Sequence, residues 1–159
     1  METALLALNG WLEAAGLVDW ARSSAHVYPW ANVLHVIGVA LLVGGIGVVD
    51  LRVAGLWRAL PLEPLSRALT PIAIAGLLVQ GASGLVLFAA DGAALAASET
   101  FQIKLGLLGL ALLNAAAFRL RWCRGRGNRT PGGLLRASAL LSLLLWLAIA
   151  VAGRLIAYY

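Results

Sequence analysis

Residues 33–45 read Val-Leu-His-Val-Ile-Gly-Val-Ala-Leu-Leu-Val-Gly-Gly, an apolar run that contains one ionisable side chain, His35. A membrane-spanning helix needs about 20 mainly apolar residues, and the surrounding stretch 30–49 meets that requirement. An ionisable side chain inside a span is costly and indicates a functional site, and imidazole is the commonest metal ligand among side chains. His35 is therefore predicted to bind a ligand, such as a metal, or to handle a proton; the alternative is a hydrogen bond to a neighbouring helix.

The whole chain shares this apolar character. Of its 159 residues, 62% are hydrophobic and 12% are charged, and the mean hydropathy is +0.90. A soluble domain is closer to half apolar and a quarter charged. The apolar residues form four long blocks, at about 30–49, 68–90, 101–120 and 134–158. We predict an all-α polytopic membrane protein, a four-transmembrane-helix bundle in which residues 1–159 form a single membrane domain.

The N-terminal segment 3–20 is apolar on one side, but it is interrupted by Asn9, Gly10 and Gly16. Because it is too broken to span a bilayer, we expect a short amphipathic helix in the interface, with its tryptophans at the depth of the lipid headgroups. Glu2 stands where a cleavable signal peptide would carry positive charge, so no such peptide is predicted.

The positive charges predict the orientation rather than a nucleic-acid partner. The net charge is +5 and the pI about 10.4, but most of the basic residues lie in the two connections that follow the first and third blocks. These residues are Arg52, Arg58 and Arg67, and then Arg119, Arg121, Arg124, Arg126, Arg129 and Arg136. Loops rich in Lys and Arg stay in the cytoplasm. The expectation is a multi-pass protein of the bacterial cytoplasmic membrane with both termini in the periplasm, in contact with membrane lipids and not with nucleic acid.

With this topology, each span offers one polar side chain to the outer half of the bundle. His35 lies about 7–8 Å below the outer end of its span, at 1.5 Å per residue. Lys104 lies at a similar depth on the third span, Arg154 lies about one turn from the outer end of the fourth, and Gln80 lies further in, within the outer half of the second. We predict that these four residues form the candidate site. The alternatives are that Lys104 and Arg154 reach out to the interface and that Gln80 only forms an interhelical hydrogen bond.

Other polar residues are given simpler interpretations. Asn114, in the middle of its span, is expected to make an interhelical hydrogen bond. His26 precedes Pro29 and is expected to be interfacial, because an offset of nine residues places it opposite His35 on a continuous helix. Asp50 and Arg52 are interpreted as a topological stop at the end of the first span, with lipid headgroups or another loop as alternative partners.

Small residues recur at intervals that let helices approach closely in lipid. The pairs are Ala40/Gly44, Gly38/Gly45, Gly81/Gly84 and Gly106/Gly109. The sequence has no HExxH motif, no paired CxxC and no ExxH, so a site that encloses zinc or two irons is not expected. The single Cys123 excludes an intrachain disulfide.

Several stretches together resemble a family of small bacterial four-span integral membrane proteins known as a domain of unknown function. They are residues 28–52, with Tyr-Pro-Trp, Leu-His-Val-Ile-Gly and Asp-Leu-Arg; Ser83-Gly84-Leu85; Phe101-Gln102-Ile103-Lys104 with Leu113-Asn114; and Gly153-Arg154-Leu155-Ile156. The resemblance covers nearly the whole chain and implies the fold without an activity.

The Leu-His-Val motif, followed by glycines, and a lysine at the start of a later span are also similar to the HemJ-type protoporphyrinogen oxidases and the CopD-type copper-resistance membrane domains. In the HemJ family such a histidine and lysine are associated with b-type haem, which points here to His35 and Lys104. The chain has no second histidine inside a span, and Met1 is its only methionine, so soft-ligand copper transport is poorly supported.

Three functions follow as expectations. The first is haem b binding near the periplasmic side, with His35 as the metal ligand and with Lys104 and Arg154 pairing with haem propionates. The role would be electron transfer or a redox step with a quinone or another redox partner. The second is a cofactor-free structural or assembly subunit in which His35, Gln80 and Lys104 form a hydrogen-bond network. The third, a small metal or solute transporter, would need a homo-oligomer to build a pathway.

Overall fold

The computed structural model describes residues 1–124, 131–156 and 158, with the side chains of 123 and 124 left aside. The helices in these ranges are α1 (Glu2–Ala14), α2 (Leu17–Ser23), α3 (Val27–Ala54), α4 (Leu62–Ala97), α5 (Glu99–Arg124) and α6 (Gly133–Leu155). Because α3 to α6 are each long and apolar enough to cross a bilayer, the predicted all-α membrane bundle is confirmed for the described residues.

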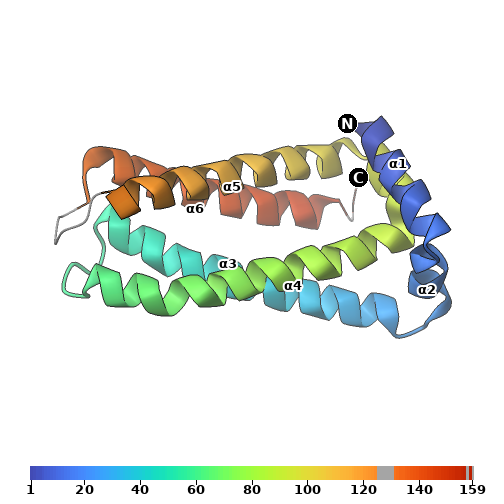
Figure 1. Cartoon of the computed structure of the whole chain (residues 1–159), viewed down its shortest axis with the longest axis horizontal. Coiled ribbons are helices and arrows are strands. Elements are labelled where there is room, and N and C mark those ends of the chain that lie inside the picture. Colours follow the sequence, from blue (N-terminus) through green and yellow to red (C-terminus); the bar gives the residue numbers. More distant parts are fainter. Residues whose placement is uncertain (125–130, 157, 159) are drawn as a thin grey trace.

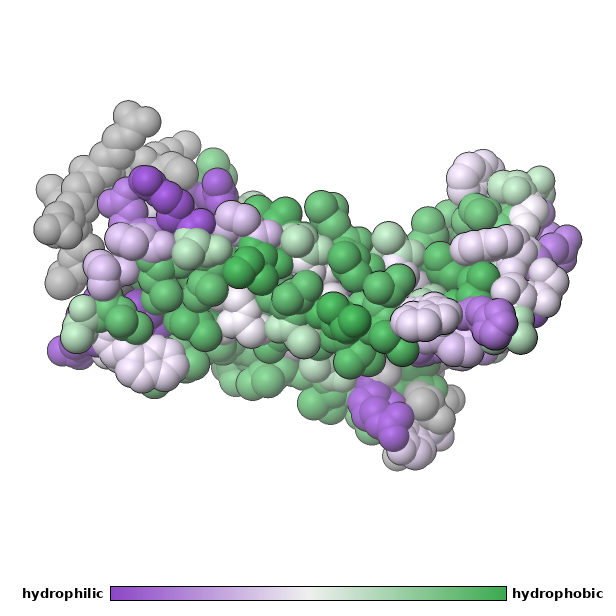
Figure 2. Space-filling view, turned by 90° about the horizontal axis from the view of Figure 1, so that it is seen from below, coloured by the Kyte–Doolittle hydropathy of each residue, from purple (hydrophilic) through white to green (hydrophobic). Residues whose placement is uncertain are grey.

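The four long helices run side by side, and both termini lie at one end of the bundle (Figure 1). We call this the terminal end and the opposite end, where α3 connects to α4 and α5 precedes α6, the loop end. In Figure 2, hydrophobic side chains cover the middle of one face and hydrophilic side chains gather towards its two ends. This distribution matches a protein whose middle faces lipid and whose ends face water.

Helix α3 is the centre of the packing, since it contacts both α4 and α6, while α5 packs mainly against α6. Among the glycines of the four spans that face another span, the tightest approach joins α3 and α4. A Cβ atom added at Gly76 would lie 2.5 Å from the backbone nitrogen of Leu42, and one added at Gly38 would lie 2.8 Å from that of Gln80. The predicted role of Gly38 and Gly45 in helix packing is confirmed, because Gly45 also lies close to Ala73 of α4. Gly44, Gly81, Gly106 and Gly109 instead face open space.

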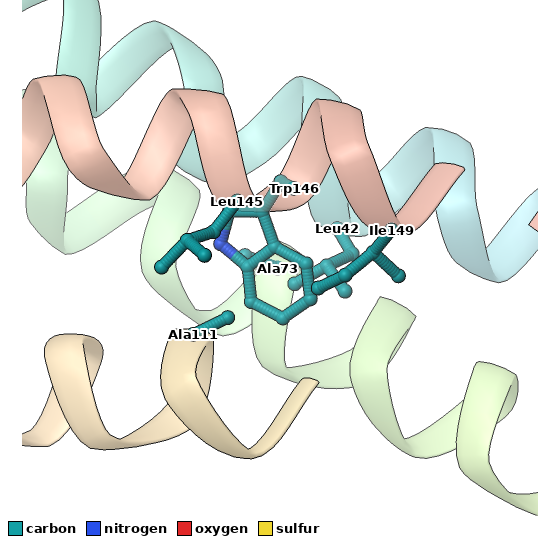
Figure 3. Packing of buried hydrophobic residues seen from close by; sticks show 6 residues of the cluster. All are labelled: Leu42, Ala73, Ala111, Leu145, Trp146 and Ile149. Atoms are coloured by element: carbon teal, nitrogen blue, oxygen red, sulfur yellow. The ribbon is translucent and has the colours of Figure 1, made fainter. Parts of the chain in front are cut away.

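The apolar core follows these contacts from one end of the bundle to the other. Near its middle, Trp146 and Ile149 of α6 pack with Leu42, Ala73 and Ala111 from the three other spans (Figure 3). Towards the loop end, a second cluster joins α3 to α6 through residues that include Val53 and Ala139. Helices α4 and α5, although consecutive in the chain, have few contacts.

The N-terminal segment forms two helices rather than the single helix predicted for 3–20. The chain breaks at Gly16, whose φ of +74° is a left-handed conformation that glycine adopts without strain. Leu12 is fully buried and packs with Phe88 and Ala89 of α4, whereas Trp11 and Trp20 are exposed. The segment is therefore packed onto the terminal end of α4 while its tryptophans remain free to contact the interface.

Helices α3, α4 and α5 are longer than their apolar blocks, whereas α6 ends at Leu155, before the end of its predicted block at 158. α3 begins at Val27, before Pro29, because proline is tolerated in the first turn of a helix, where its missing N–H has no partner to lose. α4 begins at Leu62 and continues through Pro71 to Ala97, with a kink at Asp91 (φ −140°, ψ 33°). The sequence estimate of 68–90 thus ended at the kink, not at the end of the helix.

At the loop end, the side chain of Arg52 forms hydrogen bonds with the connection between α3 and α4. Its Nε donates to the carbonyl of Leu60 at 2.7 Å, and its Nη2 donates to that of Arg58 at 3.0 Å. Arg52 thereby bonds to the connection that directly follows its own helix. Of the arginines used to predict orientation, Arg126 and Arg129 lie outside the described residues.

Candidate functional site

His35 lies in the terminal half of α3, where its half-buried imidazole faces α4. Nδ1 lies 3.1 Å from the hydroxyl oxygen of Ser83. That hydroxyl donates its single hydrogen to the carbonyl of Val79 at 2.7 Å, with a longer contact of 3.2 Å to the carbonyl of Gln80. Since the serine hydrogen is already used, Nδ1 must carry the proton and donate to Ser83. Nε2 then keeps its lone pair, and this is the nitrogen that could bind a ligand.

The glycine that follows Ser83 makes room for the imidazole. A Cβ atom at Gly84 would lie 3.2 Å from Cε1 of His35, a separation at which the ring would have to shift. Gln80, one turn earlier on α4, contributes a side-chain oxygen that is buried without a hydrogen-bond partner among the described residues. Its backbone is also close to the imidazole. One face of α4 thus places Ser83, Gly84 and the backbone of Gln80 beside the ring.

Lys104 enters the same region from α5. Its charge is near enough to act on the imidazole of His35, and its Nζ lies 3.4 Å from the position of a Cβ at Gly153 of α6. A larger residue than glycine at 153 would crowd the ammonium group. The structure therefore brings together three of the four predicted site residues, His35, Gln80 and Lys104.

Arg154 and His26 take other positions. The guanidinium of Arg154 is exposed, donates to the hydroxyl of Tyr158 at 2.7 Å and lies over that ring at 4.9 Å. It reaches the surface, as one of the two interpretations of its sequence position expected. His26 is an exposed residue at the start of α3, in agreement with its predicted interfacial place.

A surface pocket of about 490 Å³ near the start of α4 is lined by residues that include Glu63 and Arg67. A second, of about 450 Å³, lies near the terminal end and is lined by residues that include Arg22, Tyr28 and Asp91. Neither of these pockets includes His35. For the described residues, there is also no group of three or more His, Cys, Asp or Glu side chains placed to hold a metal ion, so a protein-enclosed metal centre has no ligand set here.

Two polar residues are more important in the structure than the sequence indicated. In the sequence, Ser83, which orients His35, stands out only as part of the Ser83-Gly84-Leu85 motif. Its spacing of three residues from Gln80 is the sequence feature that places both on one helix face. Asp50, interpreted as a stop, is 4% exposed. Its position one turn before the buried Val53 placed it on the inward face of α3.

Asn114 makes the expected interhelical bonds, donating to the carbonyl of Ser138 at 2.9 Å and accepting from its hydroxyl at 2.8 Å.

Comparisons of the chain with protein-family profiles, with curated proteins and with solved structures found no match. The function must therefore be argued from the geometry of these residues.

Proposed function

We propose that this integral membrane protein binds one b-type haem at the terminal half of its bundle, where Nε2 of His35 would hold the iron. The hydrogen bond between His35 and Ser83 carries the proposal. Histidines that ligate a metal usually donate their other ring N–H to a fixed partner, which sets the tautomer and the ring orientation. Here Ser83 is that partner, and its own hydrogen is committed to α4.

In such a site His35 would hold the iron and Lys104 would supply a nearby cation. Lys104 would pair with a haem carboxylate, because a cation in a partly buried site favours a carboxylate partner. Gln80 offers a buried amide oxygen without another partner among the described residues. Arg154 is given no part, since its guanidinium is engaged with Tyr158. When bound, haem supplies one-electron redox chemistry, so the role we propose is electron transfer or a redox step with a quinone or another redox partner.

The visible spectrum of the detergent-purified protein tests this proposal. Protein from haem-supplied cells should show a Soret band that shifts on reduction with dithionite. His35→Ala should lose the band, because the axial ligand is gone. His26→Ala is the matched control, since it removes the chain's other histidine and should leave the band in place. A colourless wild-type preparation would refute haem binding.

A cofactor-free structural subunit is the second candidate, and the same hydrogen bond supports it. The bond links α3 to α4 at a level where the two backbones are close. An interhelical hydrogen bond of this kind stabilises the packing of two membrane helices. In that case the wild type is colourless, and His35→Ala lowers the thermal stability of the bundle while His26→Ala does not.

A further inference from the structure

Asp50 is a buried acid inside a span, near the loop end of α3. Its side chain is 4% exposed, and its Oδ2 is buried without a hydrogen-bond partner among the described residues. A carboxylate in such a place is expensive unless it is paired with a cation or carries a proton. Acidic side chains buried in membrane bundles commonly mark pathways for ions or protons.

No described cation pairs with Asp50. Arg52, two residues later, has its guanidinium on the carbonyls of Arg58 and Leu60. The salt bridge found in the described part of the chain joins Glu63 and Arg67, on the exposed start of α4. Arg136 on α6 and Arg119 on α5 are exposed. Among the described residues, the neighbour that acts on the carboxyl is the neutral hydroxyl of Ser142 on α6.

Further polar groups are buried on this side of α6. Ser142 and Ser138 are 6% and 7% exposed, and Ser138 is bonded to Asn114 of α5. One turn beyond Ser142, Nε1 of Trp146 is a buried donor that has no hydrogen-bond partner in the described part of the chain. Figure 3 shows this nitrogen on the Leu145 side of the indole ring, turned away from Ile149. The structure thus buries an unpaired acceptor on α3 and an unpaired donor on α6, with serine hydroxyls on the same helix.

We propose that Asp50 is a proton-binding site that exchanges with water at the loop end of the bundle. Buried donors and acceptors that do not reach each other are normally satisfied by internal water, and water is also the carrier that a proton needs. The carboxylate takes a proton from a water molecule or hydronium ion at the loop end and later returns it to water. The hydroxyl of Ser142, which acts on the carboxyl, would hold its orientation. This site is separate from His35 and does not depend on haem.

Infrared spectroscopy of the full-length protein, in lipid and without added haem, tests the proposal. A protonated carboxylic acid has a carbonyl band that moves to lower frequency in D₂O. The wild type should show such a band, it should decline as the sample is titrated to alkaline pH, and it should move in D₂O. Asp50→Asn, which keeps the size of the side chain, should lack the band.

Two further variants make the assignment specific. Asp91→Asn replaces an exposed acid on α4 and should leave the band unchanged. Ser142→Ala should keep the band but change its frequency, because one hydrogen bond to the carboxyl is lost. A band that persists in Asp50→Asn, or one in the wild type that neither titrates nor exchanges, would overturn the proposal. The proposal would also be overturned if the wild type lacks the band and is more stable in sodium chloride than in choline chloride. That result would favour a metal-cation site.

Discussion

Gly76 is the residue on which the contact between α3 and α4 depends most. Gly76→Ala should lower the free energy of unfolding by about 1–3 kcal/mol, the usual cost of overpacking, because the new methyl group would meet the backbone of α3 at 2.5 Å. Backbone atoms cannot move aside as a flexible side chain can. Thermal or denaturant unfolding in detergent, followed by circular dichroism, measures the change.

Gly81, on the same helix, is the matched control. Nothing lies within 4 Å of a Cβ atom at that position, so Gly81→Ala should be neutral or stabilising by up to about 1 kcal/mol, the difference in helix propensity. Equal effects of the two substitutions would show that the close approach of α3 and α4 does not limit stability.

The tautomer of His35 gives a second test at this scale. In a His26→Ala background, ¹⁵N-labelled histidine reports on His35 alone, since the chain has two histidines. The spectrum of the neutral ring should show Nδ1 protonated, because Ser83 accepts that hydrogen. Ser83→Ala should give a mixture of tautomers, whereas Ser142→Ala, a buried serine on α6, should change nothing. Protonation at Nε2 in the parent protein would contradict the arrangement.

The place of His35 could be predicted from the sequence, but its partner could not. An ionisable residue in an apolar run is visible in any hydropathy pattern, and the depth argument also selected Gln80 and Lys104. Ser83 and Asp50 were not selected, because a serine is common in membrane helices and an acid beside an arginine resembles the end of a span. Which face of each helix points inward decides their roles, and that depends on packing against three other helices.

Among the elements, α1 has one buried side chain, Leu12. Leu12 is fully buried against α4. Leu12→Ala should therefore cost about 2–5 kcal/mol, as large-to-small core substitutions do. Much of that loss should appear as release of α1, which limited proteolysis of the N-terminal segment would detect.

Leu8, on the same helix, is 39% exposed and serves as the control. Leu8→Ala should leave the rate of cleavage close to that of the wild type. Rapid cleavage of the wild type itself would show that α1 is not packed as the structure has it.

The four spans were predicted in number and approximate place, but their ends were not. Apolar content locates the part of a helix that lies in lipid. The helices themselves continue into polar sequence, as α4 does on both sides of its predicted span, because backbone hydrogen bonding does not require apolar side chains. The sequence showed Gly16 as an interruption, but it did not predict that the chain changes direction there. The reason is that the second helix is short and is positioned by its contacts with α4.

For the whole molecule, the arrangement of charge predicts which end faces the cytoplasm. Arg58 and Arg67 lie near the loop end, on the connection between α3 and α4 and the start of α4, and the terminal end of the bundle has fewer basic residues. If the positive-inside rule decides the orientation, the loop end is cytoplasmic. A labelling experiment tests this orientation.

Ala25 and Ala59 provide a matched pair of exposed positions at opposite ends of the bundle. Each is changed to cysteine in a Cys123→Ser background, and cells of a Gram-negative host are converted to spheroplasts and treated with a membrane-impermeant maleimide. Ala25→Cys should be labelled in intact spheroplasts. Ala59→Cys should be labelled only after the membrane is opened, because the arginines keep that connection inside. The reverse pattern would place His35 on the cytoplasmic side and Asp50 on the outer side, and the water that exchanges with Asp50 would then come from the periplasm.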